Sequence, residues 1–309
     1  MAESKSTSKR SRNGLARLLP SRDGLESAGR WSLRVLFVAL GAGAIWGSLC
    51  VEQQVRSDPR FFLENWELEA GELPEWVTPE IRDELVGVRL VGEGGPLSLF
   101  QPGVLDSVRQ ALSRSPWIKA VPDIEVRYPT HEAPGALALS LHVRRPVALV
   151  EHESFFYLAD ADGMRLGPAY ALAPTEWFGV PAITGIPAPG PLPLPGERWT
   201  SRDVAQGVEV ARVLLEHAIA RDFPEHPIQA IDLTNLHGRV TPRESEVMLW
   251  CGRQRLAWGR SPISSGPRTA TTQEIVANLR KVLGNFDAYN HLAVIHLHRR
   301  SDALTGIRG

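Results

Sequence analysis

Residues 35–51 form an uncharged apolar run, VLFVALGAGAIWGSLCV, which constrains the chain more than any other feature. At about 1.5 Å per residue a helix over this run is roughly 25 Å long, slightly short of the ~30 Å hydrocarbon core of a bilayer. Trp31 and Arg34 close that gap, because Trp suits the membrane interface and the Arg side chain can reach the headgroups. The run therefore predicts one transmembrane helix over 35–51.

Residues 1–34 carry eight basic and three acidic side chains, although the whole chain has a formal net charge of −1. Positive charge beside a span stays in the cytoplasm, so we expect 1–34 to be a basic, disordered cytoplasmic tail. Everything after Val51 is then exported, and the chain is a single-pass protein of the inner (plasma) membrane that contacts lipid through one span. A cleaved signal peptide and a buried helix of a soluble protein stay open as alternatives.

The remaining composition argues against several kinds of activity. A near-neutral chain is not expected to bind nucleic acid in bulk, and two cysteines, Cys50 and Cys251, give no disulfide framework. The sequence has no Gly-rich phosphate loop, no HExxH and no GxSxG. We therefore expect no enzymatic activity, no cofactor, no metal and no small-molecule substrate.

Hydrophobic periodicity predicts an α+β fold with two modules after the span. In the first, over 61–150, the expected elements are a strand at 61–70, a helix from Pro79 to Val86 with Thr78 as its N-cap, a helix from Gly103, a strand at 124–128 and a strand at 136–143 whose apolar residues alternate with polar ones. In the second, over 151–300, they are a hairpin ending near 166, a proline-rich connector at 186–196, a helix at 201–221, a strand at 228–233, a hairpin at 246–258, a helix opened by the capping box Thr271–Glu274, and a strand at 291–299. Residues 301–309 are expected to be a C-terminal tail.

Several short motifs occur in a fixed order along these two modules. They are Ser115-Pro116-Trp117-Ile118-Lys119, Arg144-Arg145-Pro146-Val147-Ala148, the run Tyr157–Gly163 (YLADADG) and Val180-Pro181-Ala182-Ile183-Thr184-Gly185. In this order they resemble motifs of the bacterial cell-division proteins FtsQ and DivIB. The sequence departs from that family at Val143, where Glu is usual, and at His296-Leu297-His298, where Asp-Leu-Arg is usual.

The resemblance implies a POTRA-like strand-helix-helix-strand-strand domain followed by a β-rich domain with flanking helices. It also implies a non-enzymatic divisome scaffold at the septum that recruits and bridges membrane division proteins of the FtsB and FtsL type. We expect the motif residues to be structural: Pro116, Trp117, Arg144, Arg145, Pro146, Asp160, Gly163 and Gly185. Two other functions stay open: a POTRA-containing accessory protein of envelope biogenesis or transport, and a periplasmic cell-wall enzyme.

The last expected strand is the candidate for partner binding, because an edge strand offers N–H and C=O groups to a partner's strand. Ile295 and Leu297 are expected on one side of it, and His296 and His298 on the other, with Arg299 at its end. Proline at Ile295 and Leu297 is expected to abolish binding of an FtsB-type partner. An internal or solvent-facing strand without a partner stays equally open.

Two patterns resemble metal sites but lack enough ligands. Asp160, Asp162 and Gly163 begin like a calcium loop, yet no downstream Glu follows at the required spacing, so a hairpin turn is expected. His296 and His298, even with His291 or Cys251, give no defined zinc ligand set.

Overall fold

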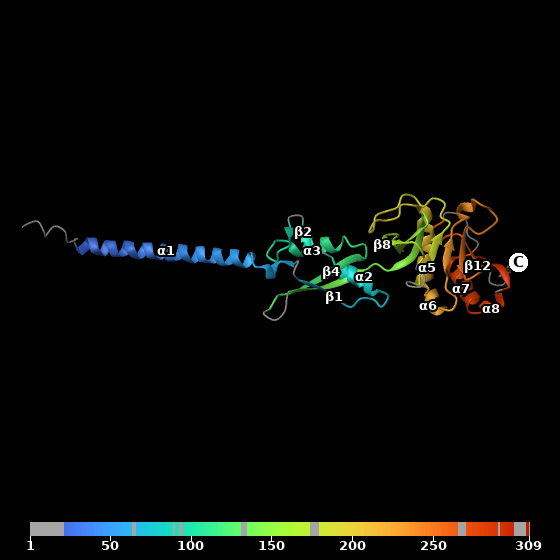
Figure 1. Cartoon of the computed structure of the whole chain (residues 1–309), viewed down its shortest axis with the longest axis horizontal. Helices are drawn as coiled ribbons and strands as arrows, with labels where there is room; N and C mark the ends of the chain where they lie inside the picture. The colour runs from blue at the N-terminus through green and yellow to red at the C-terminus, as the bar shows by residue number, and fades with distance from the viewer. Residues whose placement is uncertain are drawn as a thin grey trace, which may run out of the picture. The chain divides into compact units, whose positions relative to one another are not determined.

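The computed structural model describes residues 22–63, 66–88, 90–92, 95–130, 135–173, 179–264, 270–289, 291–299 and 307–308. The chain divides into two compact units, Met1–Phe61 and Phe62–Gly309. The first holds a long apolar helix and the second is a mixed α+β structure rich in strands (Figure 1). The predicted fold class is confirmed.

Helix α1 spans Arg22–Arg56 and contains the predicted apolar run. Its segment Val35–Arg56 has a mean hydropathy of 1.8 and no buried side chain, so it is long and apolar enough to cross a membrane. The helix begins well before this segment, so Arg22–Arg34, expected to be disordered, is helical instead. Extending an existing helix costs less than nucleating a new one, which explains the longer helix. The rest of the expected tail lies outside the described residues.

A three-stranded sheet opens the second unit, in the order β1 (Glu67–Ala70), β5 (Ala136–Val143), β4 (Ile118–Arg127). Strand β1 runs parallel to β5, and β4 runs antiparallel to it. The helices α2 (Pro79–Val86) and α3 (Val104–Leu112) bury Leu85 and Val108 in one core with Leu137 and Leu139 of β5. The alternation along β5 and the cap of α2 by Thr78 agree with the sequence analysis. A short pair, β2 (Val91–Gly92) with β3 (Gly95–Pro96), lies before α3.

Two strand predictions in this part were wrong in extent. Strand β4 begins at Ile118 rather than Ile124, and it pairs with β5 through two register shifts between Ile118 and Asp123. Pro122 lies inside this stretch. Proline has no N–H to donate to a neighbouring strand, so in the sequence it argues against a strand, although a strand can accommodate it at a bulge. The strand expected at 61–70 is confined to Glu67–Ala70, and Pro59–Phe61 is a turn of 3-10 helix.

A sheet of nine described strands forms the rest of the unit. It starts with the meander β6 (Pro146–His152), β7 (Phe155–Asp160) and β8 (Arg165–Tyr170). The remaining strands are β9 (Ala182–Thr184), β10 (Ala230–Asp232), β11 (Val247–Cys251), β12 (Gln254–Gly259), β13 (Leu292–His296) and β14 (Ile307–Arg308), and the spatial order is β14-β13-β12-β11-β10-β9-β6-β7-β8.

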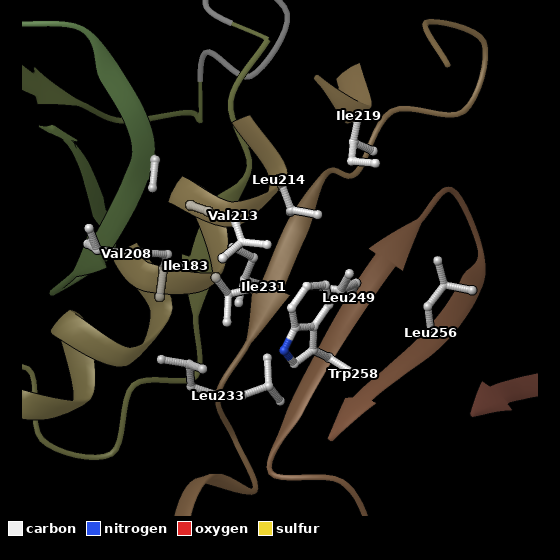
Figure 2. Close-up of a cluster of buried hydrophobic side chains, with 14 of the residues drawn as sticks. Ile183, Val208, Val213, Leu214, Ile219, Ile231, Leu233, Leu249, Leu256 and Trp258 are labelled. Atoms are coloured by element: carbon white, nitrogen blue, oxygen red, sulfur yellow. The ribbon is translucent and has the colours of Figure 1, made fainter. Parts of the chain in front are cut away.

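One face of this sheet packs on helices α5 (Arg202–Glu216) and α7 (Thr272–Leu283). Figure 2 shows Val208, Val213 and Leu214 of α5 in the same cluster as Ile231 and Leu249 of the sheet. The capping box of Thr271 and Glu274 at the start of α7 is present, as its sequence predicts. The helix expected over 201–221 is instead interrupted at Ala218, whose φ is +52°, and resumes as α6 (Ile219–Asp222).

The opposite face of β6, β7 and β8 is buried as well. Leu149, Leu158 and Leu166 belong to the same core as Trp117 and Leu137 of the three-stranded sheet. Strand β6 is therefore covered on both faces, which explains why PVALV lacks the alternation of a half-exposed strand. The two sheets of the second unit share this core.

Candidate functional site

The candidate partner-binding residues lie in β13 and just after it. Ile295 and Leu297 are fully buried in the core under α7, whereas His296 and His298 are partly exposed and Arg299 is exposed. The side assigned to each of these residues from the alternation is the one observed. The strand itself ends at His296, three residues earlier than expected.

Hydrogen bonds from neighbouring elements hold both ends of β13. The side-chain Nε2 of Gln254 in β12 donates to Leu292 O at 2.7 Å. At the other end, Asn278 Nδ2 of α7 donates to Leu297 O at 2.8 Å and to Arg299 O at 2.9 Å. Asn278 is buried, so these bonds satisfy carbonyl groups that would otherwise lose water on folding. The segment after β13 therefore keeps a defined path along α7.

The backbone of β13 presents alternate amides to its two sides. Leu297 N–H donates to Ala257 O of β12 at 2.9 Å, and β12 runs parallel to β13. Successive residues of a strand point their N–H groups in opposite directions, so Ile295 also faces β12 while Val294 and His296 face outward. Proline at Ile295 or Leu297, expected to block a partner, would therefore break the contact with β12 instead. The outward positions for such a test are Val294 and His296.

Strand β13, the last strand expected from the sequence, is followed by a further strand in the structure. Strand β14 pairs with its outer side in antiparallel orientation, with Leu292 opposite Arg308 and Val294 opposite Ile307. The pairing stops two residues before His296. A two-residue strand has no periodic pattern of its own, so sequence reasoning had no signal for it.

The two histidines form a compact pair beside β12. Their ring centroids are 5.4 Å apart with an interplanar angle of 86°. His298 Nδ1 lies 3.2 Å from Ala257 O and 3.4 Å from Ser245 Oγ, so Nδ1 carries the proton that is donated to the carbonyl. Burial lowers the pKa of both histidines, and Arg299 lowers the pKa of His296 further. For His298 the hydrogen bond to Ala257 O opposes the effect of burial, and Arg299 adds to it, so the pKa is still lowered and the folded protein favours the neutral form of both rings.

Gly259 makes room for this pair. A Cβ atom at Gly259, whose φ is +103°, would come within 2.9 Å of His298 Cβ. A polar cleft of about 330 Å³ lies alongside, lined among others by both histidines and Arg299. Across it, Arg260 Nε pairs with Glu246 Oε1 at 2.8 Å. Among the described residues there is no group of three or more His, Cys, Asp or Glu side chains placed to hold a metal ion.

A second group of predicted residues meets where the two sheets join. Arg144 Nη1 donates to Asp160 Oδ2 at 2.7 Å, and the Arg144 backbone N–H donates to Trp117 O at 2.7 Å. The Arg144 side chain is 17% exposed and that of Asp160 5%. Trp117, Arg144 and Asp160 come from three separate motifs. Their two hydrogen bonds connect the start of β4 to the β7–β8 turn.

Asp160 also shapes the β7–β8 turn. Its Oδ1 accepts the N–H groups of Asp162 at 2.9 Å and Met164 at 2.8 Å. Gly163, with φ of +73°, donates its N–H to Asp160 O at 2.9 Å. The Asp160–Gly163 segment is therefore a turn in which the aspartate caps backbone amides, as expected for a hairpin.

Trp117 is the central side chain of this junction. Its Nε1 donates to Glu84 Oε2 of α2 at 2.9 Å, and its ring packs against Gly167 of β8. A Cβ at Gly167 would lie 3.1 Å from the ring, and φ there is +59°. Glu84 and Gly167 were missed by sequence reasoning, because neither belongs to a motif and their contact depends on how the two sheets meet.

The remaining motif residues do not all join this contact. Pro116 lies beside Gly196, Pro146 is buried at the start of β6, and Arg145 is exposed. Gly185 lies apart, after β9, with φ of +62°, where a Cβ would come within 2.2 Å of Thr234 Oγ1. A glycine is required there by both its backbone conformation and its neighbours.

Taken together, these observations define a class: one apolar helix able to cross a membrane, followed by an α+β unit in which two sheets share a core. No protein-family model matches the chain. The chain is similar to the cell division protein FtsQ of Myxococcus fulvus, with 26% identity over 263 residues, which cover 83% of this chain and 84% of that protein. This similarity supports the resemblance to FtsQ and DivIB that the ordered motifs indicate.

Proposed function

We propose that the chain is a cell-division protein of the FtsQ/DivIB type that crosses the inner membrane once and has no enzymatic activity. Its similarity to FtsQ of M. fulvus extends over most of both chains, which supports a shared role. We assign residues 61–150 to a POTRA-like domain and residues 151–300 to the FtsQ-type β domain. In this proposal the N-terminus is cytoplasmic, the second unit is exported, and it recruits and bridges membrane division proteins at the septum.

The observation that carries the binding proposal is the outer edge of β13. One side of this strand pairs with β12 from Val294 to His296, whereas the described pairing on the other side stops at Val294. Backbone groups on such an edge accept an added strand, and the flanking side chains select it. We infer that a partner of the FtsB type, itself paired with an FtsL-type protein, adds a strand here, next to His296, His298 and Arg299.

The cellular role is tested by depleting the protein in its own organism. Depletion is expected to give filamentous cells that grow without septa, and affinity capture of the tagged protein is expected to recover membrane division proteins. Normal septation after full depletion would count decisively against the proposal. Protease added outside spheroplasts tests orientation: it should digest the second unit and leave the basic tail intact.

The binding edge is tested by proline substitution at the outward amides. Val294→Pro and His296→Pro each remove an outward N–H without touching the bonds to β12. Both variants should lose capture of the FtsB-type partner while their thermal unfolding stays cooperative. The matched control is Ala70→Pro on the outer edge of β1, where Gly71 N–H faces β5 and the Ala70 N–H faces away. Equal capture by all three variants would remove β13 as the binding strand.

A further inference from the structure

The outer edge of β13 is not empty in this chain, because part of it is covered by the chain's own C-terminus. Strand β14 (Ile307–Arg308) lies antiparallel to β13, opposite Leu292 and Val294. The register shifts between these two pairs. The C-terminal segment therefore occupies part of the edge along which an added strand would pair.

The hydrogen-bonding pattern shows which groups this segment covers. Val294 faces away from β12, so its N–H and C=O are the groups that Ile307 can satisfy. His296 also faces outward but lies beyond the end of the pairing. Among the described residues, the edge thus consists of a half around Val294 that β14 covers and a half around His296 that no strand covers, where His296 O accepts the Arg299 N–H at 3.5 Å.

The cover is small compared with what a partner could offer. Strand β14 has two residues and pairs on one side only, whereas β13 has five residues. A longer strand adding to the same edge would form more ladder hydrogen bonds and bury more side-chain surface. Such a strand could pair first at His296 and then replace Ile307 at Val294.

We propose that the C-terminal segment is an intramolecular cap on the β13 edge, which a partner's strand displaces. The inference that the edge is covered depends only on the position of β14. The inference that a partner displaces this cap depends on the proposed function. The covered half of the edge cannot pair with a second copy of the chain, so the cap limits edge-to-edge association of the unassembled protein. The cap also weakens binding of the partner, because only uncapped molecules can bind it. The apparent dissociation constant is the intrinsic one divided by the uncapped fraction.

The cap is tested without any partner by amide hydrogen exchange at single-residue resolution on the full chain in lipid nanodiscs. In a variant that ends at Arg299, the Val294 amide should exchange at least about tenfold faster, because it loses its acceptor. The Ile295 amide faces β12 and should be unchanged, which separates loss of the cap from unfolding of the strand. Ile307→Pro removes the N–H that can donate to Val294 O but keeps the carbonyl that accepts from Val294 N–H, so it should weaken the pairing and speed exchange at Val294 by less than the truncation does.

A synthetic peptide of residues 300–309, RSDALTGIRG, is the probe for the covered position. Added to the shortened variant, it should restore slow exchange at Val294, and a scrambled peptide of the same composition should not. Unchanged exchange at Val294 after removal of residues 300–309 would overturn the cap, whatever the partner is.

Competition is then measured with the FtsB-type protein of the same organism. The shortened variant should bind it about five- to thirtyfold more tightly than the full chain, mainly through faster association. Equal affinities would overturn displacement of the cap. Faster exchange at Val294 together with no binding by either form would support the cap as a protective device and overturn the proposed function.

Discussion

Arg144 and Asp160 pair across the junction of the two sheets, with 2.7 Å between Arg144 Nη1 and Asp160 Oδ2. Asp160 receives two backbone N–H groups at its other oxygen, and Arg144 donates its own N–H to Trp117 O. The pair therefore joins the three-stranded sheet, the start of β6 and the β7–β8 turn at one point.

Arg144→Ala is expected to lower the free energy of unfolding by about 2–3 kcal/mol. Removal of one member of a mostly buried ion pair leaves the other charge without compensation, and the backbone donors to Asp160 moderate the loss. The control is Lys119→Ala, which breaks the exposed pair with Asp162 and should change stability by less than about 1 kcal/mol. Chemical denaturation measures the free energy of unfolding of both variants. Equal losses would show that the pair at the junction contributes no more to stability than an exposed ion pair.

Asn278→Leu is expected to destabilise the protein by about 1–3 kcal/mol and to loosen the end of β13. The substitution keeps the branched shape and the number of heavy atoms of the side chain but removes the donor shared by Leu297 O and Arg299 O. Amides near His298 should exchange faster, while those of β11 should keep their protection. Gln273→Leu on the exposed side of the same helix is the matched control and should have almost no effect.

Stability is expected to fall as the pH drops below about 6.5. The pKa values of His296 and His298 are lowered in the folded state by burial and then by Arg299, so the unfolded chain binds more protons in this range. Folding is favoured fully above the pKa of a free histidine and loses this contribution as pH falls toward the folded values. The other titratable or charged groups that line the same cleft are His237, Arg243, Glu244 and the Glu246–Arg260 ion pair. A variant that carries both His296→Gln and His298→Gln is unfolded thermally at pH values between 5 and 8, and its stability should depend less on pH than that of the unchanged protein. The same pH dependence in both proteins would refute the assignment of this effect to the two histidines.

Cys251 is expected to resist alkylation in the folded protein. Burial raises the pKa of its thiol to about 11, so at pH 8 it is present almost wholly as the unreactive thiol. In a Cys50→Ser background, maleimide should label Cys251 only after denaturant is added, as followed by mass spectrometry. Rapid labelling under native conditions would mean that β11 opens far more readily than its burial implies.

Local patterns were enough to predict part of this structure. The caps of Thr78 and Thr271, the alternation along 136–143 and the apolar run each act within a few residues, and each is observed where it was expected. Strand β4 shows the limit of such reasoning. In the sequence Pro122 argues against a strand, but the segment forms one because it pairs with β5.

The candidate site shows the same division. Alternation predicted that Ile295 and Leu297 share one side of the strand and His296 and His298 the other, because side chains alternate with the period of the strand. The structure shows that the side with Ile295 and Leu297 is the buried one. It did not predict which backbone amides face outward, since that depends on the neighbour β12. Nor did it predict the buried donor Asn278, which reaches the strand from a different helix.

The sequence by itself determined the apolar helix, the helix starts and the inward sides of the strands, because those properties depend on residues close together in the chain. Only the tertiary structure decided that Arg144 meets Asp160, that Trp117 rests on Gly167, and that Ile307 pairs with Val294. Those contacts join residues that are distant in sequence, and nothing local to either partner specifies the other.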